Sequence, residues 1–277
     1  MFDRMLRKPD SFLILLLAIS TALVHSASAR LPQTGFLDRT IAVQGKTYRY
    51  EVFVPANWNK QQKWPVILFL HGYGERGENG LRETDIGLPH SIRKSKKLSP
   101  FVIIMPQCLD GDHVFTDQDM EAVALAEFQQ SMKEFHGDPE RVYLTGLSMG
   151  GYATWNIAAR HPGIFAAYVP VCGGVQPNKD HPTVKASLFG DPAIPDPYAE
   201  IARRIGKTPV WIFHGDADPT VPVEESRKMA AALRAAGGNV KYTEYPGVAH
   251  DSWVKAYDEP ELFPWLLQQE LRSPEKH

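Results

Sequence analysis

The chain has 277 residues, and its 30 Lys or Arg residues nearly balance its 32 Asp or Glu residues, for a formal net charge of −2. With no basic stripe in the sequence, this balance argues against a nucleic-acid partner. The sequence has no H-E-x-x-H motif and no close pair of His and Cys residues, so we predict no metal site.

The first segment of the chain has the pattern of a secretory signal peptide. Three basic residues precede an apolar run over residues 12–24, and residues 27–29 read Ala-Ser-Ala. We therefore predict a signal peptide over residues 1–29 and a single domain over residues 30–277, secreted or periplasmic. The apolar run is short for a membrane span. An uncleaved anchor is the alternative, and after cleavage we expect no stable membrane anchor.

The rest of the chain alternates between predicted strands and helices. The first two strands alternate apolar and polar residues and predict an antiparallel start. The later strands are apolar throughout and are separated by helical stretches, which is typical of a parallel sheet covered on both faces. We therefore predict an α/β fold with eight strands, mostly parallel. The expected strands are residues 39–43, 48–54, 66–70, 101–105, 142–145, 167–171, 210–213 and 240–245, and the clearest helices are residues 117–135 and 224–236.

A glycine-rich loop follows the strand at residues 66–70 and reads His-Gly-Tyr-Gly-Glu-Arg-Gly over residues 71–77. Glycines here would let the backbone approach a substrate closely. We assign one amide of an oxyanion hole to Tyr73, with an ordinary glycine-rich turn as the alternative.

The segment over residues 146–150 reads Gly-Leu-Ser-Met-Gly, between a predicted strand and a predicted helix. A sharp turn between strand and helix is the setting in which a serine becomes an exposed nucleophile. We predict that Ser148 is this nucleophile and that the amide of Met149 completes the oxyanion hole. The alternative is a glycine-rich connection with no chemistry.

A nucleophilic serine needs a base, and the base needs an orienting acid. In chain order the acid is expected before the base. Asp216 and Asp218 both follow the strand at residues 210–213, and His250 follows the last strand. Both acids therefore qualify on position alone, and His250 is the expected base. Other histidines compete: His161 at a helix end, His181 in a polar insertion, and His214, which we expect to pack or hydrogen-bond locally.

Together these motifs resemble a known family. The chain is similar to the phospholipase/carboxylesterase and polyhydroxybutyrate-depolymerase-like esterases of the alpha/beta-hydrolase superfamily, a group that includes dienelactone-hydrolase-like proteins and predicted peptidases. The resemblance implies that Asp218, rather than Asp216, is the catalytic acid, and that Asp216 braces its loop. The residues that carry it are 71–77, 106–108, 146–151, 171–174, 214–218 and 247–253.

The resemblance implies ester hydrolysis. Together with the predicted signal peptide it predicts an exported serine carboxylesterase that needs no cofactor. Ester substrates that are small or linked to a polysaccharide fit an exported enzyme, with acetyl, feruloyl or short acyl groups all open. The alternatives are a serine peptidase of the same fold and a noncatalytic binding protein on a hydrolase scaffold.

Three aromatic residues, Tyr73, Phe115 and Trp253, are candidates for the pocket wall, with core packing as the alternative for Phe115. Trp253 is our predicted substrate-binding residue. The segment over residues 175–197 is too short for a helical cap, so we expect no large cap and interpret this segment as a loop beside the pocket or an idle insertion.

Cys108 and Cys172 are the two cysteines of the chain. Each follows a predicted strand, and in the implied strand order two other strands lie between those two. Three strand spacings of about 4.8 Å separate them by about 14 Å, which is beyond disulfide reach. We therefore predict two free thiols.

Overall fold

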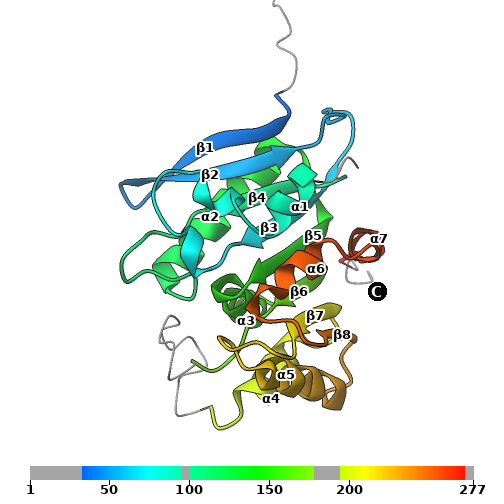
Figure 1. Cartoon of the computed structure of the whole chain (residues 1–277). Helices are drawn as coiled ribbons and strands as arrows, with labels where there is room; N and C mark the ends of the chain where they lie inside the picture. The colour runs from blue at the N-terminus through cyan, green and yellow to red at the C-terminus, as the bar shows by residue number, and fades with distance from the viewer. Residues whose placement is uncertain (1–32, 95–99, 178–193, 272–277) are drawn as a thin grey trace, which may run out of the picture. The chain divides into compact units, whose positions relative to one another are not determined.

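The computed structural model describes residues 33–94, 100–177 and 194–271 (Figure 1). Eight strands within these residues form one sheet. They are β1 (Gly35–Val43), β2 (Lys46–Val54), β3 (Trp64–Leu70), β4 (Val102–Pro106), β5 (Gly137–Leu147), β6 (Ala167–Val171), β7 (Val210–Gly215) and β8 (Val240–Tyr245).

The strand order is β1-β2-β4-β3-β5-β6-β7-β8. The pairs β1–β2 and β2–β4 are antiparallel, and every later pair is parallel. This confirms the predicted sheet of eight mostly parallel strands. The carboxyl ends of β3, β5, β6, β7 and β8 therefore meet at one edge, where ligands bind in open sheets of this kind.

Helices cover both faces of the sheet, as predicted. Four of them share one hydrophobic cluster with the sheet, and three share the cluster on the other face. The first set is α2 (Gln118–Glu134), α3 (Met149–Arg160), α4 (Pro197–Ile205) and α5 (Val223–Ala235). The second set is α1 (Leu88–Lys94), α6 (Trp253–Tyr257) and α7 (Leu262–Leu267). The described residues also form the short 3-10 helices η1 (Tyr73–Glu75), η2 (Arg82–Thr84) and η4 (His250–Ser252).

The alternation of side chains along β3 shows how the core is divided. Val66 and Leu68 enter one cluster, whereas Ile67 and Phe69 enter the other. Successive side chains of a strand point to opposite faces, so a strand with helices on both sides must be apolar at every position. All seven residues of β3 are buried, which explains why its sequence pattern was easy to interpret.

The predicted start of β5 at residue 142 was wrong, because the strand begins at Gly137. Residues 137–141 read Gly-Asp-Pro-Glu-Arg, a polar stretch that favours a turn. Gly137 nevertheless pairs with Trp64 of β3, with a register shift before Val66. Backbone pairing at the rim of a sheet does not require apolar side chains, so composition alone misses it.

Cys108 and Cys172 are both free and buried, as predicted. Cys108 follows β4 and Cys172 follows β6, with β3 and β5 between those strands.

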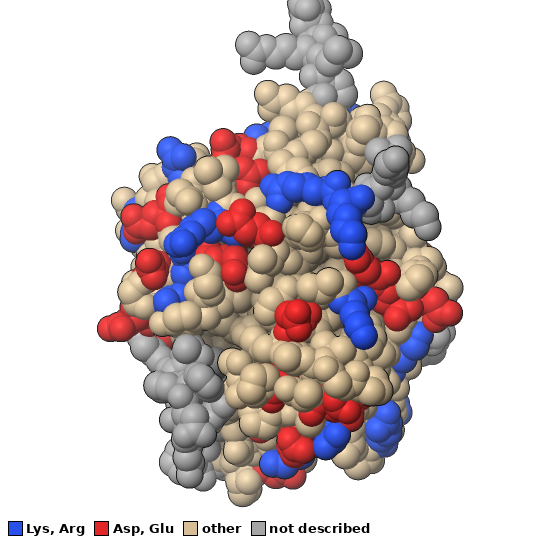
Figure 2. All heavy atoms as spheres, viewed as in Figure 1, with Lys and Arg blue, Asp and Glu red and all other residues tan. Residues whose placement is uncertain are grey.

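The predicted signal peptide over residues 1–29 lies outside the described residues, and so do residues 178–193 of the segment 175–197. In the part of the chain that is described, every helix is too short or too polar to cross a membrane. Side chains of both charges are interspersed over the face shown in Figure 2, consistent with the net charge of −2.

Candidate active site

Ser148 lies at the junction of β5 and α3 with an unusual backbone conformation, φ 52° and ψ −116°. A positive φ strains any residue with a side chain and persists only when the surroundings enforce it. Gly146 and Gly150, two residues before and after Ser148, allow the close backbone packing that enforces it. A Cβ on Gly146 would lie 2.3 Å from the Gly150 carbonyl oxygen, and one on Gly150 would lie 2.0 Å from the Leu70 carbonyl oxygen. The chain can therefore make this sharp turn only with glycine at both positions.

A chain of hydrogen bonds starts at this serine. The Ser148 Oγ lies 2.8 Å from His250 Nε2, and His250 Nδ1 lies 2.7 Å from Asp218 Oδ2. Ser148 follows β5, Asp218 follows β7, and His250 follows β8, so all three come from the carboxyl edge of the sheet. The structure thus brings together three residues that are far apart in the sequence.

Asp218 ends this chain as a fully buried carboxylate. Burial acts to raise its pKa, but hydrogen bonds from His214 and His250 and the charge of His250 outweigh burial and hold the pKa well below its usual range. Its other oxygen, Oδ1, accepts the amides of Thr220 and Val221 at 2.8 and 2.9 Å. An ionised Asp218 can only accept, so His250 Nδ1 carries a proton and Nε2 is left to accept the proton of Ser148.

Asp216 lies elsewhere in the same loop. Its Oδ1 accepts the amide of Gly247 at 2.6 Å, which confirms the prediction that it braces the loop through a backbone bond. The amide of Ala217 donates to the Val248 carbonyl at 3.0 Å. These two bonds join the loop that carries Asp218 to the loop that carries His250.

Tyr73 is the first residue of η1, and Met149 is the first residue of α3. The first amides of a helix have no acceptor within it. Gly72 brings the η1 loop against the serine turn, because a Cβ there would lie 2.8 Å from Leu147 Cδ1 and 3.8 Å from Ser148 Cβ. The two amides assigned to the oxyanion hole therefore belong to segments that adjoin Ser148.

His71 determines the orientation of the peptide between Gly72 and Tyr73. The amide of Cys108 donates to His71 Nε2 at 3.0 Å, so the ring proton is on Nδ1, which donates to the Gly72 carbonyl at 2.6 Å. Burial lowers the pKa of His71 to about 4, which keeps the ring neutral. In a trans peptide the carbonyl and the following N–H point in opposite directions. Holding the Gly72 carbonyl therefore holds the Tyr73 N–H on the other side.

Arg76 fixes the far end of this loop. Its guanidinium donates to the carbonyls of Gly111 and His113 and lies 3.3 Å from the centre of the Tyr73 ring. The Tyr73 side chain remains 40% exposed. The Tyr73 ring is therefore partly exposed to solvent and is held in place by the Arg76 guanidinium stacked on it.

The other two candidate wall residues differ in position. Trp253 packs edge-on against the His250 ring with centroids 5.5 Å apart, and it lines a cavity of about 200 Å³ beside α1 and α6. Phe115 is 1% exposed and packs against the His71 ring, which favours the alternative that it packs in the core. An aromatic residue after a strand has the same sequence pattern in either position.

The sequence analysis missed the extent of the network behind Asp218. His214 is fully buried and donates from Nε2 to Asp218 Oδ2 at 3.1 Å and to the Val221 carbonyl at 3.0 Å. The prediction that His214 bonds locally is confirmed, but its partner is the same oxygen that faces His250. Ser226 of α5 lies 2.7 Å from His214 Nδ1. The motif around His214 was the available signal, whereas Ser226 stood in no motif.

Glu225 of α5 bonds the first residues of the segment 175–197 and the residue that follows it. Its Oε2 accepts the amides of Val175 and Gln176 at 2.7 and 3.0 Å, and its Oε1 accepts the hydroxyl of Tyr198 at 2.7 Å. The conformation of the segment between these ends falls outside the described residues.

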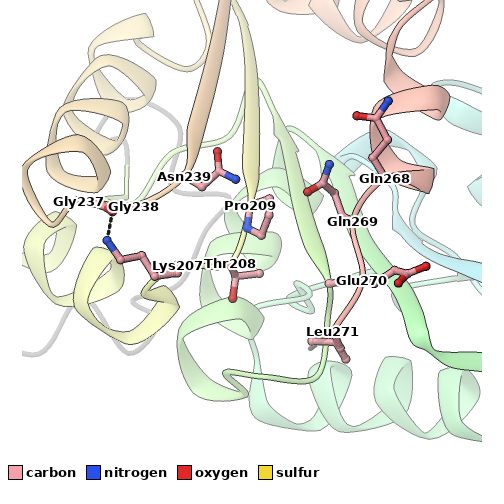
Figure 3. A pocket seen from close by; sticks show the side chains of 11 residues that line it. Lys207, Thr208, Pro209, Gly237, Gly238, Asn239, Gln268, Gln269, Glu270 and Leu271 are labelled. Carbon is pink, nitrogen blue, oxygen red and sulfur yellow. Dashed lines mark hydrogen bonds between the residues drawn. The ribbon is translucent and has the colours of Figure 1, made fainter. Parts of the chain in front are cut away.

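A cavity of about 710 Å³ lies at the opposite edge of the sheet (Figure 3). Its lining includes Pro209 and Asn239, which precede β7 and β8, and residues 268–271, which follow α7. Lys207 donates to the Gly237 carbonyl beside it. No residue of the Ser148–His250–Asp218 chain lines this cavity, and no group of metal-binding side chains occurs among the described residues.

Comparison with known proteins agrees with this architecture. The profile of the prolyl oligopeptidase family matches residues 111–269, more than half of the chain. Acyl-protein thioesterase 1 of Gibberella zeae is 26% identical over 230 residues, which cover 73% of this chain and 90% of that protein. An endo-1,4-beta-xylanase/feruloyl esterase of Xylanibacter ruminicola is 27% identical over 222 residues, which cover 75% of this chain but 27% of that protein.

The crystal structure of a thermostable esterase superposes with a TM-score of 0.70 at 30% sequence identity, covering 85% of this chain and 63% of that chain. Its likeness supports the alpha/beta-hydrolase fold that the sequence resemblance implies. The chain therefore belongs to the prolyl oligopeptidase family, and it is a serine esterase with the alpha/beta-hydrolase fold.

Proposed function

We propose that this esterase uses Ser148, His250 and Asp218 as its catalytic triad and cleaves small or carbohydrate-linked esters outside the cytoplasm. One observation carries the proposal. Ser148 Oγ, the His250 ring and a buried, ionised Asp218 form an unbroken chain with separations of 2.8 and 2.7 Å. A serine hydroxyl becomes a strong nucleophile when a neutral imidazole can take its proton and a carboxylate stabilises the cation that results.

The reaction would proceed in two halves. Ser148 Oγ attacks the ester carbonyl carbon as its proton moves to His250 Nε2, and the carbonyl oxygen becomes an oxyanion facing the amides of Tyr73 and Met149. The carbon–oxygen bond to the alcohol then breaks, and His250 returns the proton to the departing alcohol. Water attacks the acyl-enzyme, gives a proton to His250, and releases the acid while Ser148 regains its hydroxyl.

The surroundings of His250 support a carbohydrate alcohol as the leaving group. Because His250 protonates the alcohol, side chains packed on His250 lie on the alcohol side of the site. Trp253 packs there and lines the cavity of about 200 Å³, whose polar side chains include Ser91 and Asp258. An aromatic face beside hydroxyl and carboxylate groups can both stack on a sugar ring and bond its hydroxyls. The feruloyl esterase among the relatives supports the same substrate class.

A serine peptidase is the second candidate, and the family match favours it. The fold also resembles an acylaminoacyl peptidase of Pyrococcus horikoshii, with a TM-score of 0.63 at 19% identity, and this chain covers 43% of that chain. Amide and ester hydrolysis share the same groups, so substrates must discriminate between them.

The test is a substrate panel with the purified protein. p-Nitrophenyl esters of increasing acyl length, methyl ferulate and acetylated xylan are compared with peptide p-nitroanilides, and Ser148→Ala serves as the control for background hydrolysis. The proposal expects turnover of esters, including at least one carbohydrate-linked ester, and little turnover of anilides. Faster cleavage of anilides would favour the peptidase. A protein that turns over none of these and fails to bind a fluorophosphonate covalently would be a noncatalytic binding protein.

Export rests on the N-terminal pattern. Basic residues, an apolar run and Ala-Ser-Ala at residues 27–29 place cleavage before Arg30. N-terminal sequencing of the protein from an exporting host should begin at Arg30. Protein that keeps Met1 and sediments with membranes would instead indicate an uncleaved anchor.

A further inference from the structure

His214 occupies a position from which it can act on the proposed triad without touching a substrate. It is the fifth residue of β7, is fully buried, and has bonding partners on both ring nitrogens. Nε2 faces Asp218 Oδ2 at 3.1 Å and the Val221 carbonyl at 3.0 Å. Nδ1 faces Ser226 Oγ at 2.7 Å.

These partners assign the ring proton. A carboxylate and a carbonyl can only accept, so Nε2 of His214 must carry the proton that lies between them. In the neutral ring Nδ1 then accepts, and the Ser226 hydroxyl is the donor. Ser226 is 1% exposed and belongs to the first turn of α5, so a separate element of the fold supplies the donor that complements this tautomer.

Asp218 Oδ2 is consequently shared by two imidazoles. His250 Nδ1 lies 2.7 Å from it and His214 Nε2 lies 3.1 Å from it, while Oδ1 accepts two backbone amides. The Asp218 side chain is fully buried, and burial alone would favour its protonated form. The four donors around the carboxylate oppose both its protonation and its rotation. The hydrogen bond from His214 Nε2 also partly offsets the negative charge of the Asp218 carboxylate, so His250 faces a weaker charge.

We propose that His214, held by Ser226 at its other ring nitrogen, is a positioning residue for the triad: it holds Asp218 Oδ2 toward His250 and weakens the attraction of that carboxylate for the His250 proton. This inference rests on the proposed function of Ser148, His250 and Asp218. It extends the hydrogen-bonded chain from three residues to five, from Ser148 to Ser226.

Three other titratable groups around the pair keep their charge near neutral pH. Glu244 of β8 interacts with His214, and hydrogen bonds from Arg227 lower the pKa of Glu244 to about 2. Tyr152 of α3 and Cys172 after β6 interact with Asp218, and burial raises the pKa of both well above its usual range. Between about pH 5 and 9 these three groups therefore keep a constant charge.

Two substitutions at His214 separate the two bonds of the ring. The side-chain amide of Gln reaches the place of Nε2, so His214→Gln can still donate to Asp218. The shorter Asn places its amide near Nδ1, so His214→Asn can bond Ser226 but cannot reach Asp218. Ser226→Ala removes the donor to Nδ1 and so loosens the hold on the ring. Ser131→Ala is the matched control, because Ser131 is also buried but bonds Tyr50 on the far side of the core.

The experiment measures kcat and KM for p-nitrophenyl acetate from pH 5 to 9, per active site titrated with a fluorophosphonate. We expect His214→Asn to lower kcat about tenfold or more with KM changed less than about twofold, because the site binds substrate normally but holds Asp218 poorly. The acid limb of the kcat/KM profile, where activity falls as the pH is lowered, should move up by about half a pH unit or more. The reason is that an Asp218 carboxylate with fewer donors holds the His250 proton more tightly. His214→Gln should recover most of kcat and the wild-type limb.

A merely structural role predicts a different result. In His214→Asn the number of titrated active sites would then fall, but kcat per titrated site and the acid limb of the pH profile would match wild type. That outcome overturns the proposal. If His214→Asn does not fold, Ser226→Ala decides: a smaller upward shift of the limb supports the proposal, and a profile identical to that of Ser131→Ala contradicts it. Absence of turnover in the wild type would overturn the proposed function itself, and this inference with it.

Discussion

The backbone amide of Cys108 donates a hydrogen bond to Nε2 of His71 at 3.0 Å. Through this bond the loop after β4 sets the tautomer of a histidine in the loop after β3. The proton left on Nδ1 bonds the Gly72 carbonyl, and that bond orients the peptide whose N–H is assigned to the oxyanion hole. A buried cysteine without a disulfide therefore contributes through its backbone to the geometry beside Ser148.

His71→Leu should lower kcat about tenfold or more, because the peptide before Tyr73 loses the bond that orients it and a misplaced oxyanion donor weakens transition-state binding. KM should change little. His71→Asn can still donate to the Gly72 carbonyl and should retain more activity than His71→Leu. Steady-state kinetics on folded protein checks the ranking, and equal losses in both variants would remove the orienting role from the Gly72 bond.

Asp218→Asn should cost about 10⁴-fold in kcat, because an amide can donate to His250 Nδ1 and so favour the wrong tautomer. Asp216→Asn should cost far less activity and should instead lower the melting temperature, since its bond to the Gly247 amide weakens. Kinetics and thermal unfolding of both variants test this. The reverse ranking in kcat would make Asp216 the triad acid.

Trp253→Ala should raise KM for esters of carbohydrate alcohols while leaving p-nitrophenyl acetate turnover within a few-fold of wild type. The ring is expected to stack on the alcohol, and a small ester does not need that contact. Val254→Ala is the control, because Val254 is 52% exposed and lines the same cavity without packing on His250. If both substrates suffer equally in Trp253→Ala, the ring supports His250 rather than the alcohol.

Glu83→Gln should stabilise the protein increasingly as the pH rises. Burial raises the pKa of Glu83 to about 8, and neither carboxyl oxygen has a hydrogen-bond partner. An unfolded glutamate has a pKa of about 4.3, so between about pH 4 and 8 the unfolded chain has lost a proton that the folded chain keeps. The unfolded state then binds fewer protons, and stability conferred by the neutral acid is lost as the pH rises through this window.

Urea unfolding of Glu83→Gln and wild type at pH 5 and pH 8.5 measures this effect. The gain in the free energy of unfolding should be small at pH 5 and larger at pH 8.5. Glu78→Gln is the control, because the Glu78 side chain is 69% exposed. An equal gain for Glu83→Gln at both pH values would show that Glu83 is ionised in the folded protein.

The sheet was predictable from the sequence because its parallel strands are buried on both faces and therefore apolar at every position. The polar beginning of β5 was not predictable, since it depends on pairing with Trp64 rather than on burial. The helices α1, α6 and α7 have 7, 5 and 6 residues, less than two turns each. A hydrophobic periodicity of about 3.6 residues cannot be recognised over so short a length. Tertiary packing determines the conformation of these segments.

The site was predictable where a residue follows a strand, because the topology brings those loops to one edge. This reasoning placed Ser148 and His250 together but left two acids open, and the family resemblance favoured Asp218. The role of Ser226 could not be predicted, since it depends on which face of α5 turns toward β7. Trp253 and Phe115 show the same limit: both are aromatic residues near strand ends, and packing alone makes one a neighbour of His250 and the other part of the core.

The central claim is that Ser148 is the nucleophile, and covalent labelling tests it most directly. Wild-type protein is treated with a fluorophosphonate, digested, and mapped by mass spectrometry, in parallel with turnover of p-nitrophenyl acetate by Ser148→Ala. We expect one adduct on Ser148, none in the folded variant, and a loss of kcat on the order of 10⁶. An adduct on another residue, or Ser148→Ala activity above about a tenth of wild type, would contradict it.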